Sequence, residues 1–197
     1  MKIILTRHGQ TEENKAGILQ GHLPGKLSEE GIAQAKKVAQ RLKNEHVDYI
    51  FSSDLARAAD TAKEIAKLKP GTPIEFVEEL RERHLGEFQG KRKPDIGWEK
   101  ENFKEIFAGP KGGENMDQLF TRAERFLQKI LKKHPQSSVL FVGHNGINKA
   151  LIAAITKKNA SSIMDMESLK NTSVCIFEID GNKNHKTLLF NCTKHLE

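Results

Sequence analysis

Two short apolar runs, far apart in the chain, each lead into a histidine that is followed by a turn signal. Residues 2–6 lead into Arg7 and His8, and residues 139–142 lead through a glycine into His144. Apolar runs of about four to eight residues closed by a turn signal are typical of buried strands. Open parallel sheets bind ligands at the carboxyl ends of their strands, so both histidines are expected at one binding edge.

The rest of the chain alternates between strand and helix patterns. Further strands are expected at 47–52 and 74–77, a hairpin is expected over 174–190, and helices are expected after Ser28 and Asn115, both good N-caps. This alternation predicts the α/β class, as a three-layer α/β/α sandwich around a mixed, mostly parallel sheet.

More detailed expectations concern the helix after Ser28 and a further helix that follows the strand at 47–52. The helix after Ser28 is expected to bury one face, because four apolar residues recur in it at helical spacing: Ile32, Ala35, Val38 and Leu42. The helix after the strand at 47–52 is expected to begin at an N-cap formed by Ser53 or Asp54.

Length and composition favour one soluble domain over residues 1–197. Hydrophobic residues make up 37% of the chain, no run of about 18 apolar residues occurs, and no leader pattern precedes the first strand. A cytoplasmic protein with no membrane partner is therefore expected. The formal net charge of +6 suits an anionic small molecule. Nucleic-acid binding is not expected, because the basic residues are dispersed and only one Trp and one Tyr offer stacking.

Residues 83–115 form the least regular part of the sequence. They are rich in glycine and include the only tryptophan, Trp98, with a short helix expected at 102–108. Long irregular insertions inside a compact fold usually serve as lids or binding loops. We therefore expect a lid-like insertion.

The first histidine lies in a recognisable block. Arg7 to Thr11, with Asn14, resembles the signature of the histidine phosphatase superfamily, which includes the cofactor-dependent phosphoglycerate mutases. Four more blocks that resemble the family follow in its order, at residues 52–62, 80–90, 112–114 and 143–146. The resemblance implies a six-stranded mixed sheet with the site at one strand end.

The resemblance also implies a role for each residue of a phosphoryl-transfer site. Such a reaction needs positive groups around the phosphoryl oxygens and an in-line nucleophile, which a neutral imidazole can supply. By resemblance His8 is that nucleophile, Arg7 and Arg57 hold the phosphoryl oxygens, and His144 donates a hydrogen bond to one of them.

The resemblance places the acid–base carboxyl four residues before the glycine of the Leu-Gly-Glu-Phe block. That position is Glu82, before Gly86, although Glu87 is a rival on sequence grounds alone. Substrate contacts are expected from five further residues around the pocket: Asn14, Gln20, Gly21, Arg83 and Asn145. Asn145 stands where the family usually has glycine, and such a change is expected to alter the rim of the pocket.

The favoured function is a phosphatase that hydrolyses phosphate monoesters of small metabolites. A phosphoglycerate mutase is the alternative, although Leu85 replaces the tyrosine of the mutase block and no Arg pair precedes Gly112. A phospho-ligand binding module without catalysis is a further alternative. No cofactor is expected, and no metal, because the other histidines lack partners at metal-ligand spacing. A phosphorylated small molecule is the expected partner, and the protein could be a monomer or a homodimer.

Overall fold

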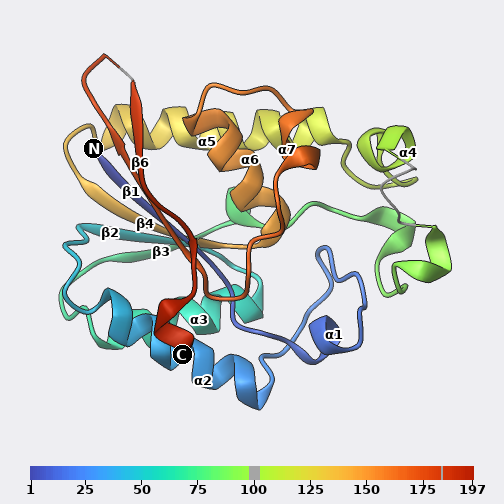
Figure 1. Cartoon of the computed structure of the whole chain (residues 1–197), viewed down its shortest axis with the longest axis horizontal. Helices are drawn as coiled ribbons and strands as arrows, with labels where there is room; N and C mark the ends of the chain where they lie inside the picture. The colour runs from blue at the N-terminus through green and yellow to red at the C-terminus, as the bar shows by residue number, and fades with distance from the viewer. Residues whose placement is uncertain (98–102, 183) are drawn as a thin grey trace.

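The computed structural model describes residues 1–97, 103–182 and 184–197, and its core is one six-stranded sheet (Figure 1). The strand order is β3-β2-β4-β1-β5-β6. Strands β3, β2, β4 and β1 are parallel to one another. Strand β5 pairs antiparallel with β1, and β6 pairs antiparallel with β5. The mixed, mostly parallel sheet is therefore confirmed, with these strands: β1 (Lys2–Arg7), β2 (Tyr49–Ser53), β3 (Ile74–Val77), β4 (Ser138–Gly143), β5 (Val174–Ile179) and β6 (His185–Cys192).

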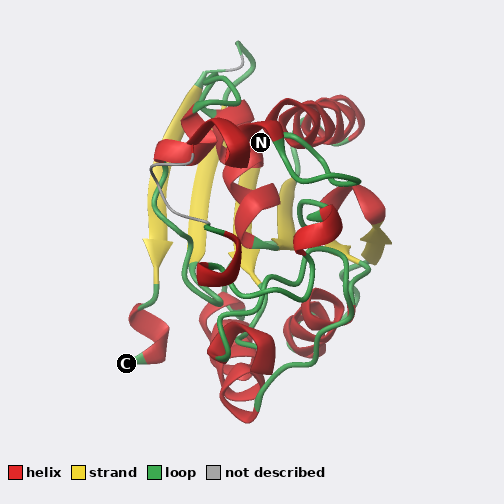
Figure 2. Ribbon diagram, turned by 90° about the vertical axis from the view of Figure 1, so that its right-hand side faces the viewer, coloured by secondary structure: helices red, strands yellow, loops and turns green. Residues whose placement is uncertain are grey.

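Helices cover both faces of this sheet, as Figure 2 shows. On one face, α2 and α3 pack against alternate strand residues such as Ile4, Ile50 and Leu140. On the other face, α5 and α6 pack against the intervening residues, such as Ile3 and Phe141. Successive strand residues point to opposite faces, and both sets are buried, as is usual for a parallel sheet covered by helices on both sides. The α-helices are α1 (Glu12–Lys15), α2 (Glu29–Leu42), α3 (Ala56–Lys67), α4 (Phe103–Ala108), α5 (Met116–Lys133), α6 (Asn145–Ile155) and α7 (Ser162–Asp165).

The expected start of α2 is confirmed, but one of its expected core residues is not. Ser28 caps the helix by accepting a hydrogen bond from the amide of Gly31. Ala35, Val38 and Leu42 are fully buried, whereas Ile32 is 42% exposed. At about 100° per residue, Ile32 lies roughly a quarter turn from the centre of that face, so its inclusion in the core was wrong.

The expected N-cap of α3 was also wrong. The helix begins after Leu55, whose side chain makes no cap bond. Ser53 instead accepts from the amide of Leu55, too early in the chain to cap the helix, which leaves its hydroxyl proton for another partner. The capping box at Asn115 and Gln118, in contrast, is present at the start of α5.

The irregular segment 83–115 lies beside the loop that follows β1 (Figure 1). Leu19 and residues 90–91 exchange two backbone hydrogen bonds, of 2.7 and 2.9 Å, and Ile18 bridges to Arg92. The segment contains short 3-10 turns and α4, which begins at Phe103, whereas Trp98 and the expected helix start at residue 102 lie outside the described residues. None of the helices in the described ranges is long and apolar enough to cross a membrane.

Candidate active site

Neighbouring parallel strands deliver the candidate residues to one edge of the sheet. His8 directly follows β1 and His144 directly follows β4. These two strands are paired with Arg7 opposite Gly143, so the two histidines emerge side by side. Their ring centroids lie 5.0 Å apart, with an angle of 59° between the ring planes. The sheet register therefore brings together two residues that are 136 positions apart in the numbering.

His8 is held with a defined tautomer. Its Nδ1 lies 2.7 Å from the carbonyl oxygen of Gly9. Because a carbonyl can only accept, Nδ1 carries the proton, and the lone pair of the neutral ring is on Nε2. Burial, with the charges of Arg7 and Arg57, holds the pKa of His8 well below its ordinary value. His8 is therefore neutral near pH 7, and its basic lone pair is on Nε2.

The loop that carries His8 is fixed by close backbone packing against α2. A Cβ atom on Gly9 would lie 2.4 Å from the carbonyl oxygen of Gly31, so only glycine allows this approach. The amide of Gly9 also donates to the hydroxyl of Thr61 on α3, and the side-chain amide of Asn171 donates to the carbonyl of His8.

Two guanidinium groups, those of Arg7 and Arg57, act through their charges on both histidines. Arg57, in the first turn of α3, is 1% exposed and donates to the carbonyls of Gly21 and Leu23. Arg7 donates to the carbonyl of Leu169. The Nε atoms of both are buried without a hydrogen-bond partner, and among the described residues neither side chain forms a salt bridge. Burial lowers the pKa of Arg57 to about 10, so it stays charged at neutral pH.

The charge of Glu82 acts on both guanidinium groups, and that of Glu13 acts on Arg57, but neither carboxylate forms an ion pair with them in the described part of the chain. Cations that are removed from water without a directly bonded anion are costly unless they bind one. Arginine is well suited to phosphate, because its planar fork presents two parallel N–H groups to two oxygens. Arg7 and Arg57, whose charges both act on His8, therefore offer the donor groups that binding of a phosphoryl group requires.

His144 is fully buried, and its Nε2 is hydrogen-bonded to the hydroxyl of Ser53 at 2.9 Å. Burial, with the positive charges of Arg57 and Arg7, holds the pKa of His144 well below its ordinary value, so this ring too is neutral. The Ser53 oxygen also accepts from the amide of Leu55, and its hydroxyl can either give its proton to Nε2 of His144 or accept one from it. Nδ1 of His144 is buried without a hydrogen-bond partner.

Glu82 lies next to the first turn of α6. Its carboxylate accepts hydrogen bonds from three backbone amides: Arg83 at 2.9 Å, Gly146 at 3.0 Å and Ile147 at 3.2 Å. A Cβ atom on Gly146 would lie 2.4 Å from a Glu82 oxygen, so glycine is required there for the carboxylate to approach. Glu87 is exposed in a 3-10 turn, so the geometry favours Glu82 over its rival.

A comparison with protein families decides the classification. The family model of the histidine phosphatase superfamily (branch 1) matches residues 3–192. The chain belongs to the histidine phosphatase superfamily.

Individual relatives agree with this assignment. The chain is 37% identical over 190 residues to a metal-independent phosphoserine phosphatase of Arabidopsis thaliana, covering 92% of this chain and 78% of the relative. It is 34% identical to the phosphoglycerate mutase-like protein 4 of the same plant, and the match covers 92% of this chain and 81% of that relative. Its fold matches a mycobacterial glucosyl-3-phosphoglycerate phosphatase in complex with VO3, with a TM-score of 0.89, 26% identity, and coverage of 98% and 99%.

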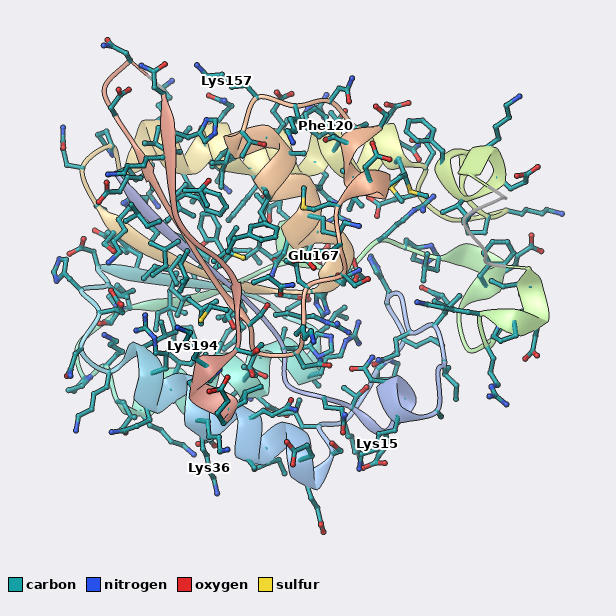
Figure 3. The ribbon with its side chains drawn as sticks, viewed as in Figure 1. Lys15, Lys36, Phe120, Lys157, Glu167 and Lys194 are labelled. Atoms are coloured by element: carbon teal, nitrogen blue, oxygen red, sulfur yellow. The ribbon has the colours of Figure 1, made fainter. Side chains whose placement is uncertain are left out.

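The rim residues of this histidine phosphatase are mostly engaged with the protein itself. The side chains of Asn14 and Gln20 both bond to Thr11, and the Gly21 carbonyl holds Arg57. Asn145 accepts from the amide of Leu169, in the segment that also holds Arg7. In Figure 3 this segment follows the labelled Glu167, and Lys15 marks α1.

The side chain of Arg83 is hydrogen-bonded to the backbone of the insertion. It is 3% exposed, and it donates to the carbonyls of Glu114 and Ile106. Its remaining terminal nitrogen, Nη1, is buried without a partner, and burial lowers its pKa to about 10. Nη1 is therefore the atom through which Arg83 could make the substrate contact that was expected from the sequence.

Sequence reasoning missed several supporting residues of the site: Ser53, Thr61, Glu114, Arg122 and Asn171. Ser53, Thr61 and Glu114 lie in the blocks at 52–62 and 112–114 that resemble the family, which was the available signal. No local pattern indicates the partners of Arg122 and Asn171, which lie 40 and 163 positions away, at Glu82 and His8. No group of three or more His, Cys, Asp or Glu side chains within the described ranges is arranged to hold a metal ion.

Proposed function

We propose that this chain hydrolyses phosphate monoesters of small metabolites in two steps, through a phosphohistidine on His8. The observation that carries the proposal is the neutral His8, with its lone pair on Nε2 and with the charges of Arg7 and Arg57 acting on it, each of which has a buried Nε without a partner. The phosphatases among the relatives support hydrolysis as the overall reaction.

In the first step Nε2 of His8 attacks phosphorus as the bond from phosphorus to the ester oxygen breaks. Arg7, Arg57 and Nδ1–H of His144 stabilise the charge on the phosphoryl oxygens. Glu82 gives a proton to the departing alkoxide. In the second step water attacks phosphorus, the N–P bond breaks, and Glu82 takes the proton that the water loses. Inorganic phosphate leaves and the free enzyme is restored.

The substrate class is tested by a phosphate-release screen over about fifty monoesters, ranked by kcat/KM, since ratios of kcat/KM measure specificity. We expect turnover of several small metabolite esters. Tight binding of phosphorylated ligands with no phosphate release from any ester would instead favour the binding-module alternative.

The mutase alternative differs in what accepts the phosphoryl group. A mutase must hold the product over the intermediate until a second hydroxyl attacks, and this excludes water. Here the carbonyls of Glu114 and Ile106 occupy most of the Arg83 guanidinium, and Leu85 is buried. Arg83 therefore has one unpartnered nitrogen, Nη1, with which to hold a substrate carboxylate.

We therefore predict that 3-phosphoglycerate, with 2,3-bisphosphoglycerate present, yields inorganic phosphate faster than it exchanges with 2-phosphoglycerate. Phosphorus NMR of one mixture follows all of these species together. Exchange between the two monophosphates that outpaces phosphate release would contradict the phosphatase proposal and support the mutase.

A further inference from the structure

Glu82 lies in a segment without regular secondary structure, so its position depends on contacts from elsewhere. Residues 82–85 belong to no helix or strand. The α6 amides hold the end of the Glu82 side chain. The main chain from which that side chain extends must be held as well, because a displacement of about 1 Å can cost on the order of 100-fold in rate.

One side chain from α5 holds that main chain. Nη1 of Arg122 donates to the carbonyls of Glu79 and Arg81, both at 2.8 Å. Nη2 donates to the carbonyl of Glu82 at 3.2 Å and to Glu114 at 2.7 Å, and Nε donates to Glu114 at 2.9 Å. All five N–H groups of a guanidinium are thereby engaged, three of them with the segment that carries the acid.

Glu114 extends this network to the far side of the acid. The oxygen that accepts from Nη2 of Arg122 also accepts from the amide of His84 at 2.9 Å. The backbone amide of Glu114 donates to the carbonyl of His84 at 2.8 Å. Residues on both sides of Glu82 are therefore tied to one Arg122–Glu114 pair, whose side chains are only 20% and 21% exposed.

We propose that Arg122 is a positioning residue that fixes Glu82 for proton transfer to the leaving group. The inference rests on the proposed role of Glu82 as acid–base. The five hydrogen bonds of Arg122 in the described structure go to Glu79, Arg81, Glu82 and Glu114, so we expect its main effect on the proton-transfer part of the reaction. A lysine cannot replace it, because one ammonium has three donors on a single atom and cannot reach carbonyls on separate sides.

The proposal is distinguished from a purely structural role by leaving-group dependence. Phenyl phosphate and p-nitrophenyl phosphate have nearly the same shape, but the phenoxide is more basic and needs a proton to leave. For Arg122→Lys we expect kcat/KM for phenyl phosphate to fall on the order of 10- to 100-fold. For p-nitrophenyl phosphate the fall stays within about threefold, because that leaving group depends little on the acid.

Two controls accompany this variant. Arg125→Lys makes the same change at an exposed position of the same helix and leaves both substrates unaffected. Inhibition by vanadate reports on the His8 pocket and is expected to change less than about twofold, as for distant, independent sites. Should Arg122→Lys fail to fold, Glu114→Gln removes the other charge of the pair and is expected to show the same leaving-group dependence.

The double variant Glu82→Gln/Arg122→Lys tests whether Arg122 acts through Glu82. If it does, Arg122→Lys adds less than about twofold in the Glu82→Gln background. Multiplicative losses, or equal losses on the two esters, would overturn the positioning role. If Glu82→Gln itself showed no leaving-group dependence, the proposed acid would be wrong, and this inference would fall with it.

Discussion

Replacing His8 with alanine is expected to lower kcat for phosphate release on the order of 10³-fold or more, the usual consequence of removing a covalent nucleophile. The loss follows from the state of His8, whose neutral ring has its lone pair on Nε2 and is acted on by the charges of Arg7 and Arg57. No other side chain that follows β1 can take its place. Released phosphate is measured with saturating substrate.

The matched control is His185→Ala, which removes a histidine from an exposed position of β6 and is expected to retain full activity. Thermal unfolding checks that the His8→Ala protein is folded. Inorganic phosphate should still bind to it, because Arg7 and Arg57 keep their backbone partners. Normal turnover by a folded His8→Ala protein is incompatible with the proposed mechanism.

Replacing Glu82 with glutamine is expected to slow hydrolysis of alkyl phosphates by about 10²- to 10⁴-fold, the usual contribution of general acid–base catalysis. An amide retains an oxygen for the amides of Arg83 and Ile147 but has no proton of suitable acidity to give. Formation of the phosphoenzyme from p-nitrophenyl phosphate should change little, since that leaving group needs little protonation. Rapid-quench measurement of the first step on both esters gives the comparison.

In the unsubstituted protein the amide of Gly146 donates to the Glu82 carboxylate. Glu82→Gln places an NH2 group there instead, so two donors face each other. A modest loss of stability is therefore expected, and the assays are run below the unfolding transition. Glu87→Gln, at the exposed rival position, serves as the control and should be silent. Leaving-group dependence at Glu87 and not at Glu82 would show that the acid is misassigned.

The parts of this site that could be predicted from the sequence are those that depend on local pattern. A strand that ends at a histidine is visible as an apolar run with a turn signal, and two such strands in a parallel sheet share one edge. The amino-acid pattern alone therefore predicts that His8 and His144 lie together, and it also predicts the capping box that starts α5. Family resemblance supplied the roles of Arg57 and Glu82.

The rest depends on contacts across the fold, which a local pattern does not indicate. Asn171 donates to the carbonyl of His8, which lies 163 positions earlier in the chain, and Arg122 donates to the carbonyl of Glu82, which lies 40 positions earlier. Ser53 was expected as a helix cap and is instead the hydrogen-bond partner of His144. Ile32 fits a helical face by spacing, but the edge of that face is open to solvent here.

The central claim is that a phosphoryl group is transferred to Nε2 of His8. Its most direct test is to quench the enzyme in alkali during turnover of p-nitrophenyl phosphate, digest it, and locate the phosphoryl group by mass spectrometry and phosphorus NMR. The account predicts phosphohistidine on His8, bonded through Nε2, because the Gly9 carbonyl occupies Nδ1. Phosphate on another residue, or a competent enzyme that accumulates no phosphohistidine even when Glu82→Gln slows its hydrolysis, would contradict it.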